Sequence, residues 1–197
     1  MHTKLLAATI LLLITSFSRA QFSFGPKAGF NLSKLSFSNG DFKTSFKPGF
    51  YFGGFAHYPL AEKMSLQGEL LYSSEGTKEK RTNANISGYI TKSYLHVPVL
   101  FQYRFYDNLY AEAGVQLGLL LSSKEKWGSG NKNDIKKYYK SSDFRLPVGV
   151  GYNFKDNLEK LGVNIRYSFS LSHINTVTVG GGNLKNQVIS IGAQYRL

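Results

Sequence analysis

The feature that most constrains this chain is a strict alternation of apolar and polar residues, which begins at Gln21 and recurs to the last residue. In the stretch LHVPVLFQYRF, residues 95–105, Leu95 and Val97 belong to one stripe, and His96 and Gln102 belong to the other. Strict alternation is the period of a β-strand, because successive side chains of a strand point to opposite faces. The sequence therefore predicts strands that have one apolar and one polar face.

Eight segments show this alternation, and none shows a convincing helical period. They cover residues 22–32, 50–58, 66–73, 95–105, 111–119, 144–154, 161–171 and 189–197. A strand of about ten residues is long enough to cross a bilayer when it is tilted. We therefore expect an all-β fold: an eight-stranded antiparallel up-and-down transmembrane β-barrel that forms one domain, residues 21–197.

The connections between these segments alternate between short and long. Short turns are predicted near residues 59–62, 107–108 and 155–157, and long loops at 34–47, 74–92, 122–142 and 172–186. Bacterial outer-membrane barrels have this asymmetry, with short periplasmic turns and longer external loops. Both ends of the barrel domain are then expected on the periplasmic side.

The direction of the apolar stripe separates a membrane barrel from a soluble one. In a soluble, secreted ligand carrier of lipocalin-like shape, the apolar stripe would fill the interior. The outer face would then consist mostly of Gly and Ser, with few charges for solubility. The apolar stripe carries no charge in any segment, whereas the other stripe is rich in Gly, Ser, Gln and Asn. Because small polar side chains suit a narrow lumen, we expect the apolar stripe to face lipid.

Aromatic residues gather near both ends of the apolar stripes. On the turn side they are Phe22, Phe24, Tyr58, Tyr103, Phe105, Tyr152, Phe154 and Tyr195; on the loop side they are Phe30, Phe50, Tyr72, Phe144 and Phe169. Two aromatic girdles are expected where a barrel meets the lipid headgroups on each side.

The first twenty residues, MHTKLLAATILLLITSFSRA, have the pattern of a secretory signal peptide. Lys4 gives the positive start, residues 5–14 form an apolar run, and Ser18-Arg19-Ala20 is a small-x-small cleavage site. A membrane-anchoring helix needs roughly 18 or more apolar residues. We therefore expect cleavage near Ala20 and a protein of the outer membrane of a Gram-negative bacterium.

The strand patterns also resemble a known family, the PorT-like outer-membrane β-barrel domain proteins. The matching pieces are FGPKAGFNLS (24–33), YLHVPVLFQYRF (94–105), LYAEAGVQLGLLL (109–121), DFRLPVGVGYNF (143–154), LGVNIRYSFSLSHI (161–174) and VISIGAQYRL (188–197). The resemblance implies an eight-stranded outer-membrane barrel of mostly unassigned activity. Members usually carry an acidic residue where His96 stands, and such barrels often finish on an aromatic residue rather than on Leu197.

Charged residues on the polar stripe form the first candidate site. They are Lys27, Glu69, Arg104, Glu112, Arg145, Arg166 and Arg196. Because Arg104 and Glu112 flank the turn at Asp107, we expect them to lie opposite or diagonal to each other and to pair. An ion or solute path is one interpretation. We favour a structural plug, because unpaired charges in a narrow lumen are costly and eight strands leave no aqueous channel.

Two prolines, Pro98 and Pro147, also lie on the polar stripe. Proline cannot donate to the hydrogen-bond ladder of a sheet, and a closed barrel has no edge to accommodate it. We therefore expect bulges or locally irregular pairing at both positions.

The long loop at 122–142 forms the second candidate site, because it holds six Lys, two acids and the only Trp. The residues of interest are Lys124, Lys126, Trp127, Lys132, Lys136, Lys137 and Lys140. Near an anionic surface each cation contributes about 1 kcal/mol. We expect a solvated loop resting on the outer-leaflet lipid and lipopolysaccharide, and the alternative is a surface for an acidic protein or glycan partner. Nucleic acid is not an expected partner of a secreted protein, despite the formal charge of +12.

No catalytic, metal-binding or cofactor-binding site is predicted. His57 and His96 face the lumen without the spacing of a metal site, and the chain has no cysteine. Ser172 and His173 are the nearest candidates for a barrel-type lipid-modifying enzyme, and ordinary loop residues are the favoured interpretation. The run at 180–182, three glycines, lacks the context of a phosphate loop and is predicted to be a loop tip. The sequence thus favours a non-enzymatic barrel with a structural or surface-interaction role.

Overall fold

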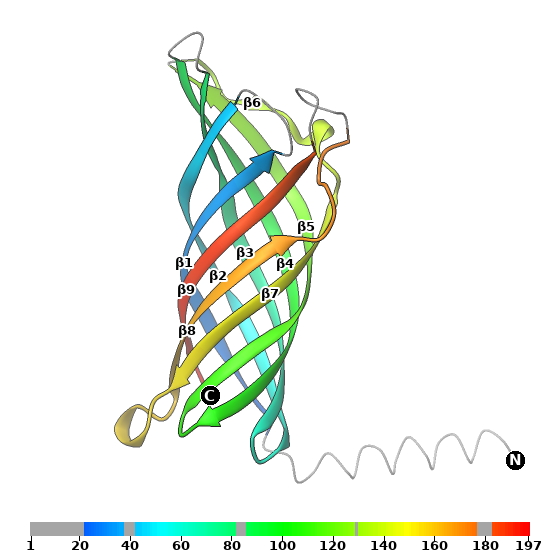
Figure 1. The fold of residues 1–197 in the computed structure, drawn as a ribbon. Helices are drawn as coiled ribbons and strands as arrows, with labels where there is room; N and C mark the ends of the chain where they lie inside the picture. The colour runs from blue at the N-terminus through cyan, green and yellow to red at the C-terminus, as the bar shows by residue number, and fades with distance from the viewer. Residues whose placement is uncertain (1–21, 38–41, 82–85, 129, 177–182) are drawn as a thin grey trace, which may run out of the picture.

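The computed structural model describes residues 22–37, 42–81, 86–128, 130–176 and 183–197, which form a tall barrel of tilted strands (Figure 1). The strands are β1 (Ser23–Phe37), β2 (Phe42–Ala61), β3 (Met64–Arg81), β4 (Ile86–Tyr106), β5 (Leu109–Trp127), β6 (Asn133–Asp134), β7 (Ser142–Asn153), β8 (Leu161–Ser170) and β9 (Leu184–Tyr195). Two short 3₁₀-helices are η2 (Lys136–Tyr138) and η3 (Asp156–Leu158). The predicted signal peptide and the run of three glycines lie outside the described residues.

The long strands close into an antiparallel ring. Their order is β4-β3-β2-β1-β9-β8-β7-β5, and pairing of β4 with β5 completes the circle. The two-residue strand β6 pairs with β5 at the loop end. The predicted eight-stranded up-and-down barrel is therefore confirmed. No helix among the described residues is long and apolar enough to cross a membrane.

The strands are strongly staggered as well as tilted. A line of paired residues that leaves β5 at Ala111 and follows each partner once round the ring returns to β5 at Ser122. Such a shift in register is what the closure of a small barrel requires. The line climbs from the turn end towards the loop end of the barrel.

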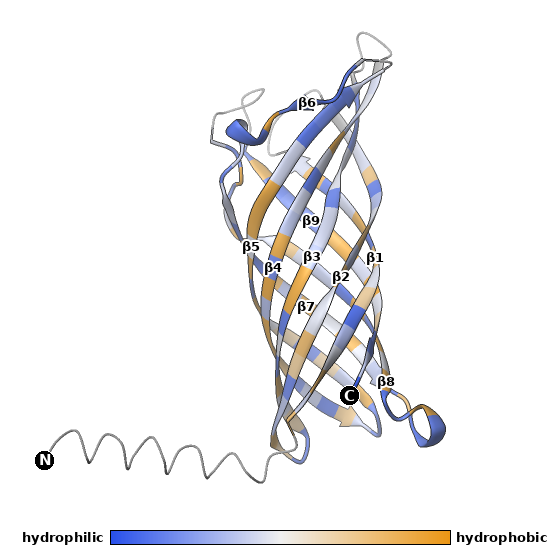
Figure 2. Ribbon diagram, turned by 180° about the vertical axis from the view of Figure 1, so that it is seen from behind, coloured by the Kyte–Doolittle hydropathy of each residue, from blue (hydrophilic) through white to orange (hydrophobic). Residues whose placement is uncertain are grey.

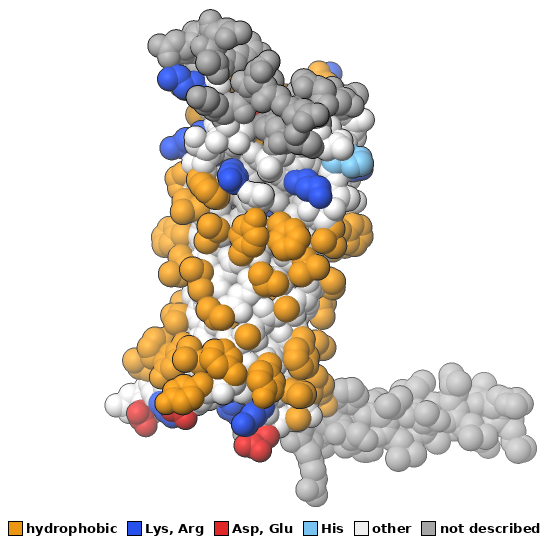
Figure 3. All heavy atoms as spheres, viewed as in Figure 1, with side chains coloured by type: hydrophobic (Ala, Val, Ile, Leu, Met, Phe, Trp, Pro, Cys, Tyr) orange, Lys and Arg blue, Asp and Glu red, His pale blue; other side chains and the backbone are white. Residues whose placement is uncertain are grey.

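The apolar stripes face outward, as predicted. Phe30 is 72% exposed, Val115 is 60% exposed and Ile191 is 59% exposed, whereas Lys27 and Arg145 are both 1% exposed. Figure 2 shows the alternation of hydropathy along the strands, and Figure 3 shows hydrophobic side chains over the barrel wall with charged ones towards the two ends. Because the apolar stripe does not fill the interior, the soluble lipocalin-like alternative is wrong.

Most strands are longer than the sequence predicts, and the loops predicted at 34–47 and 74–92 are mostly strand. β3 continues to Arg81 and β4 begins at Ile86, within the loop predicted at 74–92. The outward-facing residues of these extensions are polar, such as Lys78 and Thr91. With polar residues on the outward face, the apolar alternation fades although the backbone pairing continues. The short turns after β2, β4 and β7 lie where they were predicted.

The two prolines interrupt the pairing without shifting it. The β3–β4 ladder runs from Gly68↔Val99 to Leu71↔His96 in one register, with no pair at Pro98. The β5–β7 ladder omits its pair at Pro147 in the same way. The expected irregular pairing is confirmed, but no bulge forms, because each proline keeps its pair on the other neighbouring strand.

Candidate functional site

Four charged side chains from four strands meet in the half of the lumen nearer the turns. Lys27 of β1, Glu69 of β3, Glu112 of β5 and Arg166 of β8 are each no more than 4% exposed, and together they are called the turn-side network. Closure of the barrel brings them together, although Lys27 and Arg166 are far apart in the sequence. Two cations and two anions balance in charge.

The hydrogen bonds of the turn-side network are short and directional. Glu69 accepts from Lys27 Nζ at 2.8 Å and from both terminal nitrogens of Arg166, at 2.8 and 2.9 Å. The Nε of Arg166 donates to Glu112 at 2.8 Å. Two side-chain amides donate further hydrogen bonds to the acids. Gln67 Nε2 lies 2.7 Å from Glu69 Oε1, and Gln102 Nε2 lies 3.1 Å from Glu112 Oε2. Fork-shaped contacts of this kind are among the strongest hydrogen bonds in proteins.

A second cluster, the loop-side network, lies nearer the loops and consists of Glu75, His96, Asp143 and Arg145. Arg145 donates to both carboxylate oxygens of Glu75, at 2.8 and 3.1 Å, and through Nε to Asp143 at 2.7 Å. The Nε2 of His96 lies 2.8 Å from Glu75, and Asn186 donates to Asp143 at 2.7 Å. The members of this network come from three strands: Glu75 from β3, His96 from β4, and Asp143 and Arg145 from β7.

Aromatic rings and one further lysine surround the loop-side network. The ring of Tyr94 stacks on His96 at a centroid distance of 5.2 Å, and the guanidinium of Arg145 lies 5.0 Å from the Tyr94 ring centroid. Lys92 is fully buried, with its Nζ 3.7 Å from the ring centroid of Tyr139. A cation over an aromatic face gains electrostatic stabilisation that partly offsets the loss of water.

Between the two networks a cavity of about 30 Å³ remains, lined by residues that include Glu75, His96, Arg145 and Arg166. A polar cavity of this size holds about one water molecule. Elsewhere in the interior, glycines make room for large rings: a Cβ at Gly192 would collide with the hydroxyl of Tyr51. Side chains thus fill most of the interior.

Arg104 lies diagonal to Glu112, as expected, but the expected ion pair between the two is wrong. Gln102, not Arg104, lies opposite Glu112, and Arg104 pairs with Tyr110, which places it diagonal to Glu112. Its side chain is exposed and donates to the carbonyl of Glu62. Arg104 is close enough to the turn for its side chain to reach solvent, so Arg166 of β8 becomes the ion-pair partner of Glu112. Arg196 also lies outside both networks, half-buried near the barrel mouth.

Sequence reasoning missed four buried charges. Glu75, Glu79 and Lys92 fell in the predicted loop at 74–92, and Asp143 immediately precedes the segment predicted to begin at Phe144. Continued period-two spacing from Glu69 through Ser73 to Glu75 is the signal that places Glu75 on the same face.

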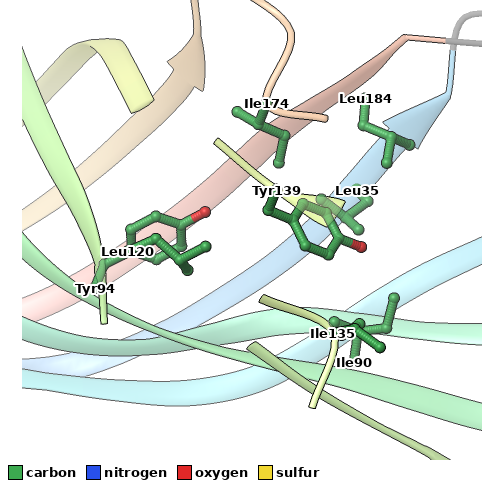
Figure 4. Packing of buried hydrophobic residues seen from close by; sticks show 8 residues of the cluster. All are labelled: Leu35, Ile90, Tyr94, Leu120, Ile135, Tyr139, Ile174 and Leu184. Atoms are coloured by element: carbon green, nitrogen blue, oxygen red, sulfur yellow. The ribbon is translucent and has the colours of Figure 1, made fainter. Parts of the chain in front are cut away.

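An apolar cluster caps the lumen at the loop end (Figure 4). It contains Leu35, Ile90, Tyr94, Leu120, Ile135, Tyr139, Ile174 and Leu184. Ile135 and Tyr139 come from the segment after β5, and Ile174 comes from the segment after β8. Backbone bonds join these two segments, from Lys140 N–H to Ile174 O at 2.7 Å and from Thr176 N–H to Tyr138 O at 3.0 Å. We call this cluster and its two segments the apolar cap.

The second candidate site is therefore only partly a loop. Lys124, Lys126 and Trp127 belong to β5, and β6 folds back onto β5. The Trp127 indole donates to Glu125 at 3.2 Å. Lys132, Lys136 and Lys137 are exposed, and Lys140 is half-buried beside the apolar cap. The cationic side chains thus sit on a folded segment whose Ile135 and Tyr139 side chains are buried in the apolar cap.

A closed antiparallel ring with lipid-compatible outer stripes and a polar interior defines the class of transmembrane β-barrels. The model of the outer membrane protein beta-barrel domain family matches residues 16–175. The chain belongs to this family, and its location is the outer membrane of a Gram-negative bacterium. No curated protein sequence matches the chain.

The chain is similar to three solved structures, and the two with TM-scores above 0.5, Neisserial surface protein A and OprG, show the same fold. Neisserial surface protein A is 15% identical, with 88% of this chain and 97% of that chain covered and a TM-score of 0.51. OprG of Pseudomonas aeruginosa is 17% identical, with 89% and 95% covered and a TM-score of 0.51. Ail of Yersinia pestis is 16% identical, with 89% and 99% covered and a TM-score of 0.49. At these identities the likeness concerns the fold alone.

Proposed function

We propose that this protein is a non-enzymatic outer-membrane barrel whose lumen is closed by paired charges. The observation that carries the proposal is the set of buried ion pairs, in which Glu69, Glu75 and Glu112 each accept from an arginine at 2.8 Å. The apolar cap lies over the same lumen at the loop end. Because ion transport would have to break these contacts in a poorly hydrated interior, the networks act as a plug.

Conductance in planar bilayers tests the plug. Wild-type protein, shown to be folded and inserted by its heat-modifiable migration on gels, is expected to leave the current at baseline. Steady channel currents whose ion selectivity changes in Glu69→Gln would contradict the plug and support an ion path instead.

We further propose that the basic loop end rests on anionic lipopolysaccharide. Lys124, Lys132, Lys136 and Lys137 are exposed at this end, and exposed charges act on an anionic surface that lies within a Debye length, about 8 Å at physiological salt. Replacing all four with Gln should weaken binding of the refolded protein to lipopolysaccharide aggregates, and added salt should remove the difference. If the replaced protein binds as tightly as wild type at low salt, a specific acidic protein or glycan partner becomes the candidate instead.

Three narrower assignments belong to the same proposal. The strand patterns support membership of the PorT-like branch, and the leader pattern supports cleavage near Ala20, which mass spectrometry of the mature protein tests. Ser172 and His173 are both exposed just past β8, which supports a non-enzymatic role. An altered lipid profile in Ser172→Ala and His173→Ala cells would instead support a lipid-modifying enzyme.

A further inference from the structure

The turn end of the barrel holds a polar cavity of about 720 Å³. Its walls come from β1, β2, β4 and β7 and from the residues after β9, so it spans the barrel mouth. A volume of this size lies within the range of small-molecule sites, about 300–1,000 Å³. We call this cavity the turn-end vestibule.

The charges of the turn-end vestibule are not balanced as those of the turn-side network are. Arg104, Lys155, Lys160 and Arg196 line it together with His57, and the acids on its wall are Asp156 and Glu159. Lys155 lies 3.4 Å from Asp107. Among the described residues, no carboxylate lies within ion-pair distance of Arg104, Lys160 or Arg196. The terminal carboxylate of Leu197 is likewise beyond this distance.

Each of the two arginine side chains donates to one acceptor among the described residues, a main-chain carbonyl for Arg104 and a side-chain oxygen for Arg196. Arg104 donates to the carbonyl of Glu62, and Arg196 donates to Asn153 Oδ1 at 2.9 Å. A guanidinium carries five N–H donors, so most of these donors point to solvent or to a ligand. Burial lowers the pKa of Arg196, as does the nearby charge of Arg104, against the opposing effect of Tyr110. Two like charges held near each other are stabilised when an anion binds between them.

We propose that the turn-end vestibule binds an oxyanion group, a carboxylate or a phosphate of a periplasmic ligand, between Arg104 and Arg196. The planar guanidinium fork matches the geometry of both groups and binds either one through two parallel hydrogen bonds. Lys160 supplies a further positive charge at the edge. The proposal requires the barrel fold and does not depend on the plug.

Titration of the refolded wild-type protein in nonionic detergent with inorganic phosphate and with citrate tests the site. The side-chain Nε–Hε signals of Arg104 and Arg196 are expected to shift along a saturable curve. Sodium chloride at matched ionic strength is expected to cause only small, unsaturated shifts. Saturation with phosphate alone assigns a phosphate-bearing ligand, and saturation with citrate alone assigns a carboxylate-bearing one.

Variants decide whether the arginines form the site. The double change Arg104→Gln, Arg196→Gln should weaken binding at least tenfold, and the exposed single change Arg104→Gln should weaken it less. The double change Lys78→Gln, Lys80→Gln, at two exposed lysines at the opposite end of the barrel, is the matched control and should bind as wild type does. Shifts that match those in sodium chloride, or unchanged affinity in the folded double arginine variant, would overturn the proposal. Neither result of the titration changes the baseline conductance that is expected of the wild-type protein. The conductance experiment therefore tests the plug independently of the anion site.

Discussion

Glu69 is held by three separate side chains in the lumen. It accepts from Lys27, Gln67 and Arg166, all at distances of 2.9 Å or less. Burial removes water from the carboxylate and from both cations, so each charge depends on the others for its stabilisation. Loss of one member therefore costs more than the loss of an exposed ion pair.

At this scale we predict that Glu69→Gln lowers the free energy of unfolding by about 3–5 kcal/mol, because it leaves Lys27 and Arg166 buried without their shared anion. Urea titration of the protein refolded into lipid vesicles measures the change. Glu62→Gln is the matched control, because Glu62 is exposed in the turn after β2, and it should change stability by no more than about 0.5 kcal/mol. Equal effects of the two changes would show that the network contributes little.

Individual strands match small residues with large ones across the lumen. Gly29 of β1 and Gly192 of β9 leave the space that the ring of Tyr51 fills, and Gly151 of β7 does the same for Tyr110. A glycine weakens a strand by itself, so its use here follows from the packing of the partner ring. Outward-facing Gly68 has open space around its Cβ position.

We therefore predict that Gly192→Ala destabilises the barrel by about 1–3 kcal/mol, because the added methyl group collides with the Tyr51 hydroxyl. Gly68→Ala should leave stability unchanged or slightly raised, and the same urea titration compares the two. A Gly192→Ala protein as stable as Gly68→Ala would mean that Tyr51 moves aside at little cost.

The apolar cap gives a second prediction at the scale of an element. Tyr139→Ala removes a buried ring that packs on Ile90, Ile135 and Lys92, so the segment after β5 should open more often. Trypsin should then cut after Lys136, Lys137 and Lys140 several-fold faster than in wild type. Tyr138→Ala, an adjacent and 42% exposed tyrosine, is the control and should leave the cleavage rate nearly unchanged.

The whole molecule reverses the arrangement of a soluble protein, because apolar side chains lie on the outside of the wall and charged side chains lie inside it. Its exposed surface over the middle of the wall is apolar, and its buried side chains include four arginine and lysine residues, Lys27, Lys92, Arg145 and Arg166. This arrangement is stable only where lipid replaces water outside, because the apolar wall would otherwise be exposed to water.

At the scale of the molecule we predict that Ile165→Arg lowers the stability in lipid vesicles by about 2–4 kcal/mol, because it places a charge on the lipid face of β8 near mid-height. Thr91→Arg, on the outward face of β4 near the loop end, should cost about 0–1 kcal/mol. If the two substitutions cost the same, the apolar band is not where the membrane lies.

The sequence alone determined the strand periodicity, the number of strands, the short turns and the direction of the apolar face. These are local properties, because the period of two and the turn residues act within a few positions of the chain. The inward position of Lys27, Glu69, Glu112, Arg145 and Arg166 follows from the same period.

Only the tertiary structure decided which charges meet. Ring closure and stagger set Arg166 against Glu112 and Glu69, and they leave Arg104 exposed near the turn. The full length of β3, β4 and β5 also depends on pairing between strands. Between the apolar band and the loop end, the residues no longer alternate between apolar and polar. Partners distant in the sequence are chosen by the register of the closed barrel, and no local pattern encodes that register.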